Sequence, residues 1–212
     1  MKVGVIDYGS GNLGSVLRAF ENLGTNADLI EDPSRLADYR AAILPGVGNF
    51  TSSMNDLHQR GWVDALRDWV AGGKTDLLGI CVGMQLLADF GDEGAGAEGP
   101  TKGLGLIRGT VRHLASFGCT ERVPHVGWNS IQHSGDPLFR GIRPGTDFYF
   151  VHSYAMDVVQ EDDLIAEVHY GARLPTAVRS GRVYGTQFHP EKSGRAGHAL
   201  LRNFLELATW SR

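Results

Sequence analysis

The sequence predicts a single α/β domain over residues 1–212, with a central mixed, mostly parallel sheet flanked by helices and antiparallel additions in the second half. In the first half, short apolar runs bounded by glycine or acidic residues alternate with helical patterns, as in βαβ units. From Leu104 onward, β-branched and aromatic runs dominate. The 212 residues exceed a typical domain of roughly 100–150, but α/β folds often reach this size around one core. No repeat or linker divides the chain.

The first half supplies the expected parallel strands. They are Lys2–Asp7, Ala27–Glu31, Ala41–Leu44 and Asp76–Ile80. Helices are expected at Asn12–Leu23, Trp62–Ala71 and Val82–Phe90, with one short helix at Pro33–Asp38. Glycine and acidic residues between these segments are typical of the turns that join strands to helices.

The second half begins with an acidic, glycine-rich segment, Gly91–Gly103, which we expect to be a mobile surface loop. The strands that follow are expected at Leu106–Leu114, Val123–Ile131, Phe148–Val151, Leu164–Tyr170, Thr176–Arg179 and Val183–Phe188. A final helix is predicted because Leu200, Leu201, Phe204, Leu205 and Ala208 recur at three- and four-residue spacing.

Composition excludes several classes of function. A net charge of −4 gives no positive field for nucleic acid. No apolar stretch approaches the roughly 20 residues that span a bilayer, and no secretory signal pattern is visible, so a cytoplasmic protein without membrane contact is expected. Cys81 and Cys119 are the two cysteines, too few for a disulfide framework or a zinc knuckle. We expect neither a metal nor a cofactor.

A glycine motif near the N-terminus has two interpretations. Gly9–Gly14 fits G-x-G-x-x-G between a strand and a helix, and Glu31 and Asp32 follow the next strand, as in dinucleotide-binding proteins. A tight strand-to-helix turn needs the same glycines. Because a three-glycine pattern has low specificity in a glycine-rich chain, the plain turn is favoured.

Cys81 lies in a G-x-C-x-G pattern between an expected strand and an expected helix. Gly79 and Gly83 flank it at two residues on either side. A strained turn of this kind exposes a nucleophile, and a Cβ at either glycine would collide with the neighbouring strand or helix. A helix N-terminus beside the sulfur stabilises a thiolate. A cysteine in an arbitrary position is more often packed and buried at a strand end, but the two flanking glycines and the helix that follows favour the elbow here.

A histidine and a carboxylate that could serve such a thiol end the strand near the C-terminus. His189 and Glu191 flank Pro190, and positions i and i+2 of an extended chain point to the same side. Glu191 could therefore bind one imidazole nitrogen and leave the other for a thiol. Alone, the triplet is more often a surface turn. None of the other histidines has a carboxylate so placed, and metal-type spacing is absent.

The two motifs together, Gly79 to Gln85 and Gln187 to Glu191, resemble class I glutamine amidotransferases. The resemblance covers nearly the whole chain. Within this class, the chain resembles more specifically the glutaminase subunits of imidazole glycerol phosphate synthases. The segments that carry this narrower likeness are Asp7–Leu13, Leu44–Phe50, Pro124–Asn129 and Phe148–Tyr154. It implies the flavodoxin-like amidotransferase fold and a turn at Gly9–Gly14 that faces a partner subunit.

The resemblance also implies a mechanism. A catalytic triad of Cys81, His189 and Glu191 hydrolyses glutamine to glutamate and ammonia. Peptide groups form the oxyanion hole; the residues implied are Gly46, Val47, Gly48 and Val82. The residues implied for binding glutamine are Gly48, Gln85, Glu93, Ser153 and Tyr154. For Glu93 a solvated loop charge, and for Gln85 an exposed helix position, are the alternatives.

The resemblance implies a protein partner for the ammonia. That partner is a cyclase subunit, forming a heterodimer that makes imidazole glycerol phosphate and aminoimidazole carboxamide ribotide in histidine biosynthesis. Asn12, Trp128 and Tyr149 are the candidate interface residues, although each could be a packing residue. Three rival hypotheses remain at this point: a dinucleotide-binding oxidoreductase, another thiol hydrolase such as a cysteine peptidase, and a non-catalytic interaction module.

Overall fold

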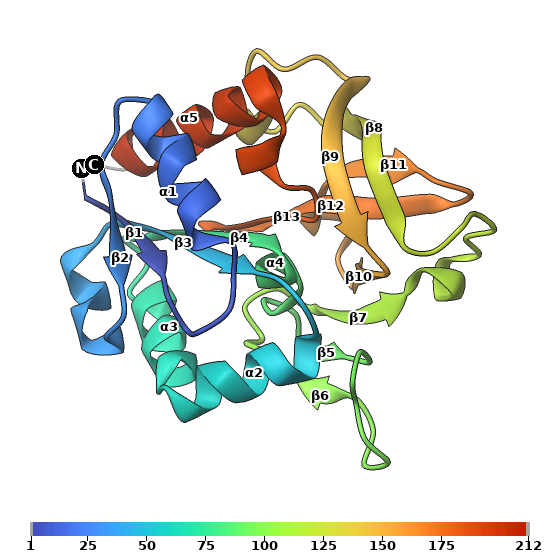
Figure 1. Ribbon diagram of the computed structural model, residues 1–212, viewed down its shortest axis with the longest axis horizontal. Coiled ribbons are helices and arrows are strands. Elements are labelled where there is room, and N and C mark those ends of the chain that lie inside the picture. Colours follow the sequence, from blue (N-terminus) through green and yellow to red (C-terminus); the bar gives the residue numbers. More distant parts are fainter. Residues whose placement is uncertain (1, 211–212) are drawn as a thin grey trace.

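The protein is built around a nine-stranded sheet in the order β2-β1-β3-β4-β13-β12-β11-β8-β9 (Figure 1). The computed structural model describes residues 2–210. Neighbouring strands are parallel from β2 to β13 and antiparallel from β13 to β9. The predicted division into a parallel first half and antiparallel additions is therefore confirmed for this sheet, except at β13 (Val183–Thr186). The sequence places this strand among the antiparallel additions, but it reverses direction after β12 and so pairs parallel with β4.

Strand bounds agree closely with the sequence expectation. The parallel strands are β1 (Val3–Ile6), β2 (Ala27–Ile30), β3 (Ala41–Gly46), β4 (Asp76–Cys81) and β13 (Val183–Thr186). The antiparallel strands are β8 (His125–His133), β9 (Thr146–His152), β11 (Leu164–His169) and β12 (Arg173–Ser180).

Helices cover both faces of the parallel half. On one face lie α1 (Leu13–Asn22) and α5 (Gly194–Trp210), and on the other lie α2 (Phe50–Gln59) and α3 (Trp62–Ala71) (Figure 1). Strands β3 and β4 are consequently buried at every residue, as expected for parallel strands between two helical layers. Short 3₁₀ helices are η1 (Pro33–Asp38), η2 (Leu114–Phe117), η3 (Pro137–Phe139), η4 (Glu161–Asp163) and η5 (Pro190–Lys192).

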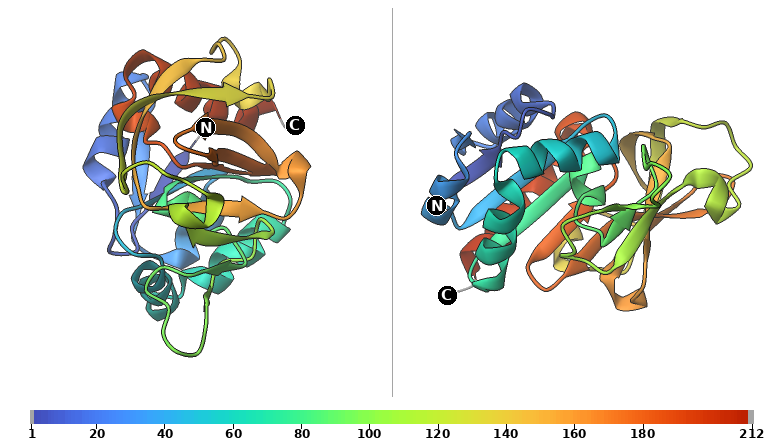
Figure 2. Two further views of the ribbon diagram at one scale, coloured as in Figure 1. Left: turned by 90° about the vertical axis from the view of Figure 1, so that its right-hand side faces the viewer. Right: turned by 90° about the horizontal axis from the view of Figure 1, so that it is seen from below.

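A second sheet of four strands packs beside the antiparallel half, in the order β10-β7-β5-β6 (Figure 2). Its strands are β5 (Phe90–Gly91), β6 (Thr101–Lys102), β7 (Gly109–His113) and β10 (Tyr154–Val158). The sequence predicts β7 but not β10, because β10 is separated from β9 by Ser153 alone and reads as part of one apolar run.

The predicted helix Val82–Phe90 is wrong in its second half. Helix α4 covers only Val82–Gln85. The carbonyl oxygens of residues 86–89 accept hydrogen bonds from the backbone N–H groups of residues 103–107. Since these carbonyls are satisfied by a neighbouring segment, the helix does not need to continue.

The segment Gly91–Gly103 is more structured than the loop we expect from its sequence. Its ends pair as β5 and β6, and Glu93 is tied to the start of α2. Helix α2 itself is absent from the sequence expectation. The side chain of Asn49 caps it by accepting from Ser52 N–H, a local signal that the poor helix formers of its first turn obscure.

No helix among residues 2–210 is both long and apolar enough to cross a bilayer.

Candidate active site

Three adjacent parallel strands bring the candidate catalytic residues together at their carboxyl ends. Strand β4 ends at Cys81, which is in register with Gly46 at the end of β3. On the other side β4 pairs with β13, and the chain reaches His189 three residues after β13 ends. The carboxyl edge of a parallel sheet is where α/β folds place ligands.

Cys81 has a strained backbone. Its φ of 56° and ψ of −113° make it the one non-glycine residue with positive φ among those described. The flanking glycines allow the turn, because a Cβ at Gly79 would lie 2.5 Å from the Gly83 carbonyl oxygen, and one at Gly83 would collide with the Leu44 carbonyl oxygen. The predicted elbow is confirmed as a backbone shape. The following helix, however, is a single turn, so the dipole contribution expected from a longer helix is reduced.

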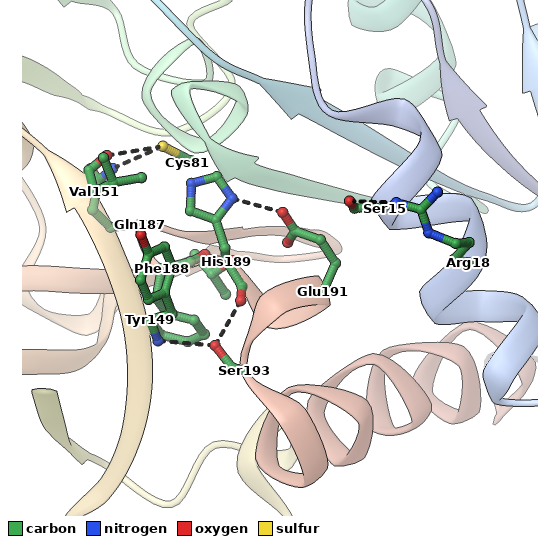
Figure 3. A network of polar contacts seen from close by, with 11 residues as sticks. Ser15, Arg18, Cys81, Tyr149, Val151, Gln187, Phe188, His189, Glu191 and Ser193 are labelled. Atoms are coloured by element: carbon green, nitrogen blue, oxygen red, sulfur yellow. Dashed lines mark hydrogen bonds and ion pairs between the residues drawn. The ribbon is translucent and has the colours of Figure 1, made fainter. Parts of the chain in front are cut away.

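His189 lies between Cys81 and Glu191 (Figure 3). Its Nδ1 is 2.7 Å from Oε1 of Glu191, and the two side chains are 3% and 1% exposed. Burial lowers the pKa of His189, but interaction with Cys81 and the hydrogen bond to Glu191 outweigh it and raise the pKa to about 9. Nε2 faces the sulfur without a well-formed hydrogen bond. This geometry suits a protonated imidazole that faces the sulfur.

The backbone of His189 is held on β9. Its N–H donates to the Tyr149 carbonyl at 2.9 Å. The Ser193 hydroxyl donates to the His189 carbonyl at 2.6 Å and accepts from Tyr149 N–H at 3.0 Å (Figure 3). These bonds fix the imidazole relative to the antiparallel half of the sheet.

The Cys81 sulfur has a second polar neighbour that the sequence motifs did not single out. Gln187 Nε2 donates toward Sγ at 3.8 Å, and the Val151 carbonyl lies 3.9 Å from Sγ (Figure 3). The signal was available, because Gln187 precedes His189 by two residues and extended positions i and i+2 share a side.

A cleft of about 170 Å³ opens beside the sulfur. Its volume equals that of roughly five or six water molecules, which suits one amino acid. Most of the predicted oxyanion and substrate residues line it, and so do Val151 and His152, which were not predicted. The lining residues are Val47, Gly48, Cys81, Val82, Gln85, Glu93, Val151, His152, Ser153, Tyr154 and His189. Gly46 is not among them.

Gly46 packs against the turn that carries Cys81 and does not line the cleft. A Cβ at this position would lie 2.5 Å from the Gly83 nitrogen and 2.9 Å from the Val82 Cβ. The next peptide is exposed, and the Val47 carbonyl accepts a hydrogen bond from the Ser10 hydroxyl at 2.9 Å. Since carbonyl and N–H of a trans peptide point in opposite directions, the Gly48 N–H faces away from Ser10.

The two long polar side chains of the cleft are held differently. Gln85 Nε2 donates to the Tyr154 carbonyl at 3.1 Å and to Gln187 Oε1 at 3.0 Å, which leaves the buried Oε1 of Gln85 without a partner. Glu93 Oε2 accepts from Phe50 N–H at 3.1 Å, at the N-terminus of α2. Partial burial raises the pKa of Glu93 despite that bond. Gln85 is thus buried, not on an exposed helix face.

The family described as "Glutamine amidotransferase class-I" matches residues 4–208. The chain belongs to this family. It is 46% identical to "Imidazole glycerol phosphate synthase subunit HisH" of Geobacillus kaustophilus, over 98% of the chain and 97% of that protein. It is 43% identical to the protein of the same name from Moorella thermoacetica, over 97% and 94%. These relatives identify it as an amidotransferase of the HisH type.

Solved structures of class I amidotransferases share the fold. One, described as "Crystal structure of glutamine amidotransferase", has a TM-score of 0.76 at 26% identity and covers 98% of each chain. Another, a glutamine amidotransferase from Thermotoga maritima, has a TM-score of 0.62 at 16% identity, covering 99% of this chain and 82% of that one. The second likeness concerns the fold alone.

In this amidotransferase the Gly9–Gly14 segment is a packed turn. Gly9 and Gly11 have φ of 92° and 124°. A Cβ on Gly9 would lie 2.6 Å from the Arg60 guanidinium, and one on Gly11 would lie 3.3 Å from the Pro45 ring. The positive φ values and the close approach of Arg60 and Pro45 are what a tight strand-to-helix turn requires of these glycines, which favours the plain turn.

The candidate interface residues of the amidotransferase come from three elements: strands β8 and β9 and the start of helix α1. Trp128 on β8 and Tyr149 on β9 are register partners whose rings meet edge to face at 6.0 Å. Trp128 is 58% exposed, and Val126 beside it is 55% exposed. Asn12 is the N-cap residue of α1 and makes no side-chain cap bond.

Proposed function

We propose that the chain hydrolyses glutamine with Cys81 as nucleophile, His189 as proton carrier and Glu191 as the group that orients His189. The observation that most supports this proposal is that His189 lies between Cys81 and Glu191, with all three side chains buried at the carboxyl edge of the sheet and Cys81 on a strained turn (Figure 3). Glutamine amidotransferase activity itself follows from the family.

In the first step the Cys81 thiolate attacks the side-chain amide carbon of glutamine, and the carbonyl oxygen becomes an oxyanion. The Val82 N–H and a peptide N–H of residues 46–48 are the proposed donors, because Val47, Gly48 and Val82 line the cleft beside the sulfur. A donor of this kind typically contributes a factor of about 10²–10³ in rate.

In the second step the amide C–N bond breaks and His189, protonated at its raised pKa of about 9, gives its proton to the leaving nitrogen. Ammonia departs and a γ-glutamyl thioester remains on Cys81. Water then attacks the thioester, with neutral His189 as base, to release glutamate and regenerate the thiolate–imidazolium pair.

Glutamine is recognised, in this proposal, by polar groups along the cleft. The Glu93 carboxylate lies where it could bind the α-ammonium group, and the unpartnered Oε1 of Gln85 is an acceptor available to the ligand. Gly48, Ser153 and Tyr154 complete the contacts from the other walls. A buried acceptor without a partner is costly, so a ligand donor would be favoured there.

We propose that the ammonia passes to a cyclase subunit bound as a heterodimer, which makes imidazole glycerol phosphate and aminoimidazole carboxamide ribotide in histidine biosynthesis. The HisH relatives are named as subunits of that synthase. The exposed pair Trp128 and Val126, with Tyr149, is a suitable surface because exposed aromatic clusters are enriched at interfaces. Asn12 at the start of α1 is a further candidate. A cytoplasmic location belongs to the same proposal.

Glutamate release from glutamine by wild type and Cys81→Ala, with and without a cyclase subunit carrying its ligand, tests the proposal. Weak activity of the chain alone, strong stimulation by the partner and loss of activity in Cys81→Ala are expected. Activity that survives in Cys81→Ala would exclude this nucleophile. Equal turnover with and without the partner would exclude the coupling.

A further inference from the structure

A chain of buried hydrogen bonds runs from strand β8 to the nucleophile and ends on Gln187. Gln187 is fully buried, and its Nε2 points toward the Cys81 sulfur at 3.8 Å. Its Oε1 accepts from Gln85 Nε2 at 3.0 Å. The two ends of the Gln187 amide therefore have different partners, so its orientation decides whether the sulfur meets a donor or an acceptor.

Gln85 fixes that orientation. Its Nε2 lies 3.1 Å from the Tyr154 carbonyl, which can only accept a hydrogen bond. The NH₂ end of Gln85 must consequently point toward Tyr154 and Gln187, and Gln187 must present Oε1 to it. The NH₂ end of Gln187 is then left to face Cys81.

The Tyr154 carbonyl is held in turn by a pair of buried histidines. It accepts from His152 Nδ1 at 2.8 Å, which requires a proton on that nitrogen. His152 Nε2 is then an acceptor, and His125 Nδ1 lies 3.0 Å from it. His125 Nε2 completes the series by accepting from Asn129 Nδ2 at 3.4 Å. Each tautomer is thus set by its neighbour.

The surroundings keep both histidines neutral. His125 and His152 are 2% and 6% exposed, and the His125 ring stacks on those of Phe150 and Tyr170 at centroid distances of 4.6 and 4.0 Å. Burial lowers the pKa of His125 to about 4 and that of His152 to about 3. Both rings are therefore neutral near neutral pH, and the hydrogen bonds to their neighbours decide the tautomers.

We propose that Gln187 is a positioning residue for the nucleophile: its Nε2–H group donates to the Cys81 sulfur, and the His125–His152 pair holds the amide in that orientation. The proposal rests on the assignment of Cys81 as nucleophile made above. A donor opposite His189 keeps the sulfur turned toward the cleft and favours its anionic form.

Gln187→Glu is the sharpest test, because it keeps the acceptor for Gln85 and removes the donor to sulfur at nearly constant volume. We expect kcat for glutamine to fall about tenfold, the lower end for a hydrogen bond to a charged group, with KM changed by less than about twofold. Iodoacetamide alkylation of Cys81, followed by mass spectrometry of its peptide, should slow by a similar factor. Gln187→Met, which loses both bonds, serves if the glutamate variant does not fold.

The alkylation rate separates positioning from packing. A variant that merely loosens the fold exposes Cys81 and speeds alkylation, whereas loss of the donor slows it. Unchanged or faster alkylation in Gln187→Glu overturns the proposal. Because alkylation needs no glutamine turnover, this outcome is distinct from failure of the proposed hydrolysis. Thr176→Val is the matched control, since Thr176 is fully buried beside Gln187 on β12 and its hydroxyl has no partner.

His125→Phe tests the other half of the proposal. Phenylalanine keeps the stacking but removes the proton donor to His152, so His152 can take the other tautomer and lose its bond to Tyr154. We expect slower alkylation of Cys81 and a kcat about threefold to tenfold lower. Wild-type values for both rates would show that the histidine pair does not position the amide.

Discussion

Nδ1 of His189 lies 2.7 Å from Oε1 of Glu191, in a pair whose side chains are almost completely buried. One residue, Pro190, separates them in sequence, and its restricted backbone keeps the two side chains from turning apart. The pair is therefore set by local geometry. Its placement against Cys81 depends on β13 lying next to β4.

Glu191→Gln should lower kcat strongly, by about 10² or more, because an amide can hold the wrong imidazole tautomer and leaves the imidazolium without its carboxylate. Loss of the Glu191 interactions also lowers the pKa of His189 from about 9 toward its ordinary value. The alkaline limb of the kcat profile should accordingly move to lower pH. A pH–rate profile of wild type and variant checks both effects, and an unshifted limb would contradict the assignment.

The buried histidine pair predicts loss of stability in acid. His125 and His152 have folded pKa values of about 4 and 3 against an ordinary 6.5. As the pH falls below 6.5 the unfolded chain binds protons that the folded chain does not, so the free energy of unfolding falls. From pH 7.5 to 5 the loss should be on the order of 1–2 kcal/mol per histidine.

Urea unfolding at the two pH values measures this acid effect. His125→Phe should show a smaller difference between pH 7.5 and pH 5 than wild type, because one of the two groups is removed. His169→Gln, at an exposed position of β11, is the control and should retain the wild-type difference. Equal pH dependence in all three proteins would contradict the buried neutral pair.

The features that the sequence predicts correctly are those set by residues close together in the chain. The glycines around Cys81 and the alternation of His189 with Glu191 are local, and both shapes were predicted. The four parallel strands of the first half follow from local patterns too, whereas the parallel pairing of β13 with β4 joins distant segments and has no local signal. The predicted helix Val82–Phe90 is longer than α4, because the end of α4 is set by hydrogen bonds from residues 103–107. No local pattern in the sequence indicates those hydrogen bonds.

The polar partners of the site were harder to predict because they join distant strands. Gln187 could have been found by alternation from His189. The link from His125 to His152, by contrast, depends on the antiparallel register of β8 and β9, where these two residues are direct partners. A register that spans 27 residues of sequence is fixed by packing.

Gly83→Ala should prevent the elbow from forming. The added Cβ would collide with the Leu44 carbonyl oxygen, which belongs to a buried strand and cannot move aside. We expect a loss of about 3 kcal/mol or more in unfolding free energy, as for overpacking in a rigid core. Gly96→Ala is the control, since its Cβ would meet nothing within 4 Å and its φ is not positive. Equal denaturation midpoints would contradict this account of the turn.

Trp128→Ala tests the proposed partner surface. A Trp that is 58% exposed contributes little to the isolated fold but can be a major contact when buried by a partner. Calorimetric titration with the cyclase subunit should show affinity reduced by about 30-fold, equivalent to about 2 kcal/mol. Val159→Ala, at a 63% exposed position at the end of β10, should bind as wild type does. Equal affinity of the two variants would place the interface elsewhere.

Glu93 should affect the binding of glutamine more than the rate of its hydrolysis. Its carboxylate lines the cleft, and Oε2 is anchored to Phe50 N–H, so the side chain is already fixed before glutamine binds. An amide at this position keeps an acceptor for Phe50 but loses the charge that would pair with the α-ammonium group. For Glu93→Gln we expect KM for glutamine to rise by about tenfold, with kcat within about threefold. Initial rates over a range of glutamine concentrations separate the two constants. A fall in kcat with KM unchanged would instead place Glu93 in the transition state and not in ground-state binding.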